Sequence, residues 1–96
     1  MNKQSIIETI KAEKPYLQKT FGVEEIALFG SYARGEEQAD SDVDILVKMN
    51  DKSLRSFIGI IDYLQEKLHR KIDLVTKHNY LSPRFLNLIN KDVIYV

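Results

Sequence analysis

The chain has 96 residues, of which 44% are hydrophobic and 29% charged, and this predicts one small soluble domain over residues 1–96. Its 14 Lys and Arg residues balance its 14 Asp and Glu residues, which argues against direct nucleic-acid binding because phosphate-tracking surfaces carry excess positive charge. It has no cysteine, apolar leader or membrane-length apolar run, so we expect a cytoplasmic protein with no thiol chemistry and no membrane partner.

The first predicted element is a helix over about residues 5–20, where apolar residues recur at helical spacing. Ser5 is the expected N-cap, because its hydroxyl can accept a hydrogen bond from a free backbone amide of the first turn. Pro15 lacks a backbone donor and predicts a kink or a restart of the helix, and Gly22 is expected to end the region.

The remaining elements alternate between strands and helices. The clearest is a helix that follows the N-cap Ser53, with a predicted buried face at i, i+3, i+4 spacing made of Leu54, Phe57, Ile58, Ile61, Leu64 and Leu68. The predicted strands are residues 25–29, 43–49, 72–76 and 93–96, and the shorter helices are residues 31–35 and 82–90. This order predicts an α/β (α+β) fold with a small mixed sheet flanked by helices.

Two acidic residues, Asp42 and Asp44, stand two positions apart at the start of the strand 43–49. Because strand side chains alternate, both lie on the face opposite Val43, about 6.6 Å apart at a rise of ~3.3 Å per residue. Their repulsion is of order 2.5 kcal/mol at an effective dielectric near 20, which favours a cation between them. Mg²⁺ suits such a pair, since substrate phosphates fill its other positions. The alternative is a polar turn with a solvent-facing Asp44.

Asp73 interrupts the otherwise apolar strand 72–76, where a charge needs a partner. If this strand neighbours the strand 43–49, Asp73 can face the same cavity as the other two acids and complete a three-carboxylate cluster. An edge position would equally account for it, as would an ion pair with one of the basic residues Arg70, Lys71 and Lys77.

The turn Gly30-Ser31 at the end of the strand 25–29 can bind phosphate. Glycine permits a positive φ and close approach of a ligand, Ser31 offers an N-cap hydroxyl, and the following amides point toward the ligand. A capped turn without a ligand is the alternative. Arg34 can return to the phosphate side of this turn, or it can pair with an acid, Glu36, Asp40 or Asp42.

The order and spacing of these residues resemble a known signature. They are similar to the signature of the DNA polymerase β-like nucleotidyltransferases. The matching residues are Gly30-Ser31-x-Ala33-Arg34-Gly35, followed by a polar loop and then by Ser41-Asp42-x-Asp44-Ile45. The short chain resembles in particular their minimal nucleotidyltransferase (MNT) branch. The resemblance implies the polymerase β-like nucleotidyltransferase fold.

The resemblance also implies a role for each candidate residue. Nucleotide, with ATP as the expected substrate, would be bound by Gly30, Ser31 and Arg34. Two Mg²⁺ ions would be held by the catalytic carboxylates Asp42, Asp44 and Asp73, and Asp73 would help to deprotonate the attacking hydroxyl.

The implied reaction is an in-line attack of an acceptor hydroxyl on the α-phosphorus of a nucleoside triphosphate, with pyrophosphate leaving. A chain of 96 residues leaves no room for an acceptor domain, so we expect the acceptor on a separate molecule. In the MNT branch that molecule is typically a HEPN-domain toxin whose tyrosine receives AMP, and the MNT protein acts as its antitoxin. The alternative is a non-catalytic antitoxin that neutralises its partner by stoichiometric masking.

Overall fold

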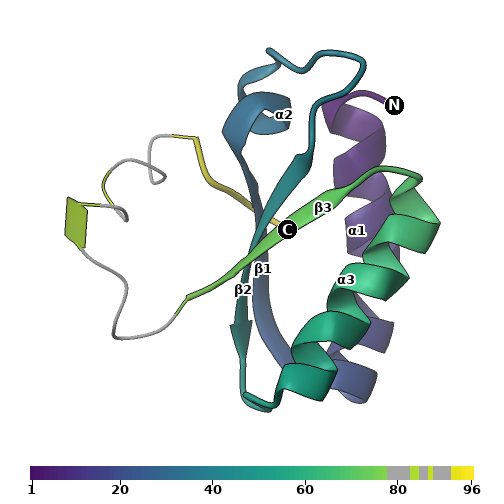
Figure 1. The fold of residues 1–96 in the computed structure, drawn as a ribbon, viewed down its shortest axis with the longest axis vertical. Coiled ribbons are helices and arrows are strands. Elements are labelled where there is room, and N and C mark those ends of the chain that lie inside the picture. The colour runs from purple at the N-terminus through teal and green to yellow at the C-terminus, as the bar shows by residue number, and fades with distance from the viewer. Residues whose placement is uncertain (78–82, 85–86, 88–91) are drawn as a thin grey trace.

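The computed structural model describes residues 1–77, 83–84, 87 and 92–96. Its sheet is mixed and has the order β3-β2-β1-β4, with strands β1 (Val23–Phe29), β2 (Val43–Met49), β3 (Ile72–Thr76) and β4 (Ile94–Tyr95). The strand β1 is antiparallel to β2 and β4, whereas β2 and β3 are parallel. The helices are α1 (Lys3–Phe21), α2 (Gly30–Arg34) and α3 (Leu54–Leu68). The predicted α/β architecture with a mixed sheet is confirmed (Figure 1).

The helix α1 begins two residues earlier than the sequence predicts, because Asn2 and not Ser5 is the N-cap. The Asn2 side chain accepts a hydrogen bond from the Ser5 amide at 2.9 Å, and the Ser5 hydroxyl accepts one from the Asn2 amide at 3.0 Å. The helix continues through Pro15 without a restart, since the fully buried Leu17 beyond it keeps the second half packed on the core. It ends as predicted at Gly22, whose φ is 71°.

The helix α3 begins after the predicted N-cap Ser53, but its buried face is rotated from the predicted one. Fully buried positions are Ile60, Leu64 and Leu68, whereas Leu54 is 71% and Ile58 47% exposed. Both exposed residues fit the apolar spacing, so the sequence pattern assigned them to the core. Among the strands that the described residues form, β3 is an edge of the sheet, and none of the others lies beyond it to cover that flank of the helix.

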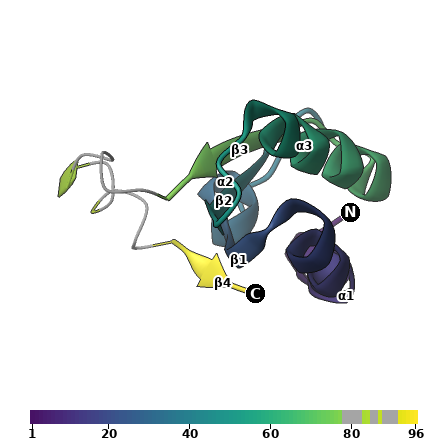
Figure 2. The ribbon, with the colours of Figure 1, turned by 90° about the horizontal axis from the view of Figure 1, so that it is seen from below.

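The sheet separates a large apolar core from a smaller one. Alternate β2 residues, among them Val43, Ile45 and Val47, pack in the large core with α1 and α3. On the other face Leu46 packs with Ala27 in the small cluster. The predicted alternation is therefore confirmed, and it puts Asp44 on the face of Leu46. Because α1 and α3 lie on the same side of the sheet, the long helices do not cover that face (Figure 2).

The other predicted elements differ from the structure mainly in their bounds. The strands β2 and β3 agree with the prediction, β1 begins two residues earlier, and β4 is shorter than the predicted 93–96. The predicted helix 82–90 falls largely outside the described residues. Within the described ranges, no helix is both long enough and apolar enough to cross a membrane.

Candidate active site

The pairing of β2 with β3 brings two of the predicted acids together. In the parallel register Asp44 lies beside Asp73, and both side chains point away from the large core. Paired strands are about 4.8 Å apart, so the two carboxyl groups are close neighbours. The predicted cluster required β3 to lie next to β2, and the structure has this arrangement.

The electrostatics of Asp44 agree with this geometry. Burial raises the pKa of Asp44 from 3.8 to about 6, and the negative charges of Asp73 and Asp42 act in the same direction. Arg34 lowers this pKa, but its effect is the smallest of these. A cation bound here would offset both the burial and the repulsion, which is what a carboxylate cluster for a divalent metal requires.

Asp73 itself lies on the exposed edge strand, as one alternative supposed. Across the ranges that the structure describes, Asp73 forms no ion pair with a basic side chain. In the same ranges, no group of three or more His, Cys, Asp or Glu side chains is arranged so that it could hold a metal ion. The acids therefore form a close Asp44–Asp73 pair, with Asp42 adding charge from the loop before β2. Such a set fits Mg²⁺, which binds proteins through one or two carboxylates and takes substrate phosphates and water besides.

The first residue of α2 approaches Asp44 very closely. Gly30 has a φ of +75°, and a Cβ atom placed on it would lie 2.0 Å from Asp44 Oδ2. Glycine is thus required here both by the backbone conformation and by the contact. The predicted N-cap role of Ser31 is wrong, because α2 begins one residue earlier and Phe29 is the N-cap, with no side-chain hydrogen bond. Ser31 instead lies within α2, next to Gly30.

Arg34 at the end of α2 pairs with two acids. Its Nε lies 3.0 Å from Glu36 Oε2, and its Nη1 lies 3.2 Å from Asp92 Oδ2. The hydrogen bonds to Glu36 and then to Asp92 raise the pKa of Arg34. Glu36 was among the predicted partners, whereas Asp92 was missed because it is 58 residues away along the chain. It comes close because β4 returns to pair with β1, and no local pattern signals that pairing.

The repulsion at Asp44 predicts that Asp44→Asn stabilises the metal-free protein at neutral pH. The pKa of Asp44 is about 6 when folded against an ordinary 3.8, so the folded state holds the proton more tightly. Wild-type stability therefore falls as the pH rises between these two values, and asparagine removes this loss. After screening by water and salt we expect a gain of ~1 kcal/mol in EDTA at pH 7.5, measured by urea unfolding.

The same gain should disappear near pH 4 and shrink when Mg²⁺ is added. The matched control is Asp62→Asn, which removes an exposed carboxylate of α3 and should change stability little at either pH. If Asp44→Asn instead destabilised the protein at both pH values, the carboxylates would be making favourable contacts and the repelling pair would be refuted.

Comparison with known proteins supports the predicted resemblance to nucleotidyltransferases. The family model described as nucleotidyltransferase domain matches residues 7–96. The protein adenylyltransferase MntA of Thermococcus cleftensis is 42% identical over 94 residues, which cover 97% of this chain and 94% of that protein. The matched family segment contains every candidate site residue.

Solved structures share the fold. A protein described as a minimal nucleotidyltransferase matches with a TM-score of 0.80 at 27% identity, over 98% of this chain and 95% of the other. A chain of the complex between the tri-AMPylated Shewanella oneidensis HEPN toxin and its MNT antitoxin matches with a TM-score of 0.58 at 22% identity, over 98% and 67% of the two chains. The chain therefore belongs to the nucleotidyltransferase family, in its minimal nucleotidyltransferase branch.

Proposed function

We propose that the chain is a Mg²⁺-dependent protein adenylyltransferase that moves AMP from ATP onto a tyrosine of a HEPN-domain toxin and thereby acts as its cytoplasmic antitoxin. The observation that carries this proposal is the placement of Asp44 beside Asp73, facing the Gly30 turn. The name of the Thermococcus cleftensis relative supports adenylyl transfer to a protein. The AMPylated toxin of the Shewanella oneidensis complex supports the class of acceptor.

The residues of the site would divide the work between binding and charge. The Asp44–Asp73 pair would hold Mg²⁺. Asp42, which the described structure does not group with them as a ready three-carboxylate site, would join as a third ligand when ATP binds, and two Mg²⁺ ions would then neutralise the triphosphate and the carboxylates. Gly30 leaves room for a phosphate oxygen close to the backbone, and Ser31 would donate its hydroxyl hydrogen to the triphosphate.

Arg34 would add positive charge on the phosphate side. It is near enough to lower the pKa of Asp44, so its field already reaches the acidic pair. In this structure its guanidinium is paired with Glu36 and Asp92. Arg34 and Glu36 are exposed and Asp92 is half-buried, and ion pairs open to solvent contribute little to stability, so a triphosphate can compete for Arg34.

The acceptor oxygen would form a bond to the α-phosphorus, and the bond from that phosphorus to the bridging oxygen would break, releasing pyrophosphate. Asp73 is the carboxylate that would take the proton of the acceptor hydroxyl. It lies on an exposed edge strand, so a protein acceptor can reach it and the proton can pass on to water. Positioning and charge are most of what such a transfer requires of a protein.

The test is to incubate the chain with Mg²⁺ and a candidate HEPN-domain protein of the same organism, using ATP labelled at either the α- or the γ-phosphorus. We expect label on the toxin from the α-labelled ATP and none from the γ-labelled ATP, and no transfer in EDTA. Label from the γ-phosphorus would indicate phosphorylation and refute adenylyl transfer. Inhibition of the toxin without any label would support stoichiometric masking instead.

A further inference from the structure

A pocket lies at the end of the sheet opposite the acidic pair. Its volume is about 420 Å³, and it opens between the end of β3 and the start of α3, lined among others by Met49, Lys52, Leu54, Phe57, Thr76 and Lys77. Met49 is five residues along β2 from Asp44, which is about 16 Å at ~3.3 Å per residue. The buried Met49 belongs to the large core, whereas Asp44 points away from it. This pocket is therefore separate from the candidate active site in both position and face.

The apolar surface of this pocket continues beyond its mouth. Met49 and Phe57 supply apolar lining, and Leu54 at the rim is 71% exposed. Ile58, which is 47% exposed, follows Leu54 by four residues, so it lies on the same flank of α3 about 6 Å further along. Together with the pocket they form a continuous apolar surface, which is the kind of surface that suits an interaction site. Their extent beyond the pocket favours a protein over a small ligand.

The rim of the pocket is positively charged. Lys52 has no ion pair within the described ranges, and its neighbour Asp51 is turned toward the start of α3. Asp51 accepts hydrogen bonds there from the Ser53 amide at 3.1 Å and the Ser56 hydroxyl at 2.5 Å. Lys77 also lines the pocket, but its ammonium donates a hydrogen bond to the Tyr95 hydroxyl at 3.0 Å and forms a long ion pair with Glu25 at 3.9 Å, so Lys52 is the main available charge of the rim.

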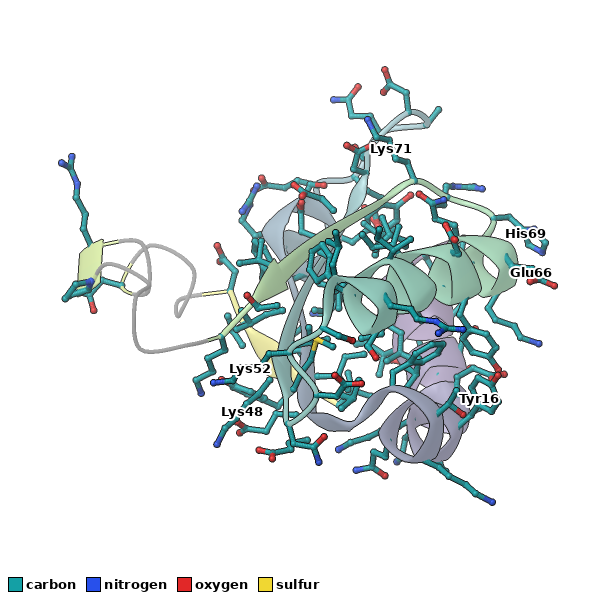
Figure 3. The ribbon with its side chains drawn as sticks, turned by 60° about the horizontal axis from the view of Figure 1, so that its bottom comes forward. Tyr16, Lys48, Lys52, Glu66, His69 and Lys71 are labelled. Atoms are coloured by element: carbon teal, nitrogen blue, oxygen red, sulfur yellow. The ribbon has the colours of Figure 1, made fainter. Side chains whose placement is uncertain are left out.

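The view with side chains shows the same separation. Lys52 and Lys48 lie together at one end of the molecule, far from Lys71, which directly precedes β3 at the end that carries the acids (Figure 3). Lys48 forms an ion pair with Glu24, with 3.6 Å between Lys48 Nζ and Glu24 Oε2, so Lys52 is the more available positive charge of the two lysines. An occupant of this surface should therefore present carboxylates around an apolar side chain.

We propose that the α3 groove, formed by Met49, Lys52, Leu54, Phe57, Ile58 and Lys77, docks the acceptor protein through an apolar side chain flanked by acidic residues. The inference rests on the proposed function, which supplies a protein acceptor. A second copy of this chain is disfavoured because a two-fold contact would set the same lysines against each other. Docking at the α3 groove would hold the acceptor independently of ATP while its hydroxyl reaches the acids at the other end of the sheet.

The test measures the Kd for the same candidate HEPN-domain protein, without ATP. We expect Lys52→Glu and Leu54→Glu each to raise the Kd about tenfold or more, as loss of an interface anchor does. The fold should tolerate both, since Leu54 is exposed and an acid in the first turn of α3 suits the helix dipole. The matched control is Lys11→Glu, the same charge change at an exposed position of α1, which should leave the Kd unchanged. An unchanged Kd in both groove variants would overturn the docking site.

Two further measurements separate this inference from the proposed function. ATP with Mg²⁺ should raise the Tm of both groove variants as much as that of wild type, and saturating acceptor should restore their rate of AMP transfer. If wild type labels the acceptor but the groove variants bind it normally, the α3 groove alone is refuted. If wild type neither binds nor labels it, both proposals fail. A dimer of the isolated chain that Leu54→Glu dissociates in sedimentation would assign the groove to a second copy instead.

Discussion

Asp44→Asn should lower the rate of AMP transfer by roughly 10²–10³-fold or more, the scale expected when an electrostatic contact to the reacting phosphate is removed. The substitution keeps the shape of the side chain but removes the negative charge that, with Asp73, would hold Mg²⁺. The measurement is the initial rate of labelling with α-labelled ATP at saturating acceptor. Urea unfolding of the variant in the assay buffer, with Mg²⁺ present, separates this loss of activity from any loss of the folded state.

Three further variants show whether the loss of activity is specific to the acidic pair. Asp62→Asn, the control on α3, should retain the wild-type rate, whereas Asp42→Asn should fall with Asp44→Asn. Ser31→Ala should have a milder effect, because the backbone amides proposed to bind the phosphate would remain. Near-normal labelling by Asp44→Asn would refute the assignment of this carboxylate to the metal.

Gly30→Ala should cause the second large loss, in both stability and activity. Its φ of +75° disfavours any residue with a Cβ by about 1–2 kcal/mol. The added Cβ would also lie 2.0 Å from Asp44 Oδ2 and 2.8 Å from its Cγ, so the Asp44 carboxylate must move. A displacement of about 1 Å at a reacting site is enough to lower a rate by ~10²-fold. Urea unfolding and the labelling rate measure the two effects separately.

The chain offers a matched control in Gly35→Ala. Gly35 has nearly the same φ, +73°, but apart from its chain neighbours no atom of the described residues lies within 4 Å of the added Cβ. Gly35→Ala should therefore show the backbone loss of stability while keeping most of its activity. Equal losses of activity in the two variants would show that the contact between Gly30 and Asp44 has no part in the reaction.

Features set by local sequence could be predicted well. The alternation of Val43, Asp44 and Ile45 along β2 fixed which side chains face the core, and the structure places them accordingly. Gly30, now the first residue of α2, was singled out for a positive φ, and its φ is positive. These predictions depend on strand pleating and backbone sterics, which act over a few residues.

Features set by contacts far apart in the sequence could not be predicted. The pairing of Arg34 with Asp92 depends on β4 returning beside β1. The exposure of Leu54 depends on β3 being an edge strand among the described strands of the sheet, which the spacing of apolar residues along α3 does not reveal. The predicted N-cap of α2 was wrong for a local reason. The helix begins one residue earlier than predicted, so Ser31 lies inside the helix and not at its cap.

The central claim, that the acidic pair beside Gly30 binds a divalent metal with ATP, is tested most directly by locating the metal. Mn²⁺ takes the same oxygen ligands as Mg²⁺, and its unpaired electrons broaden NMR signals of nearby amides. With ATP and a small amount of Mn²⁺, we expect the strongest broadening at Gly30, Asp44 and Asp73, the weakest at the far end around Lys52, and its loss in Asp44→Asn. Broadening centred elsewhere, or unchanged by Asp44→Asn, would contradict the account.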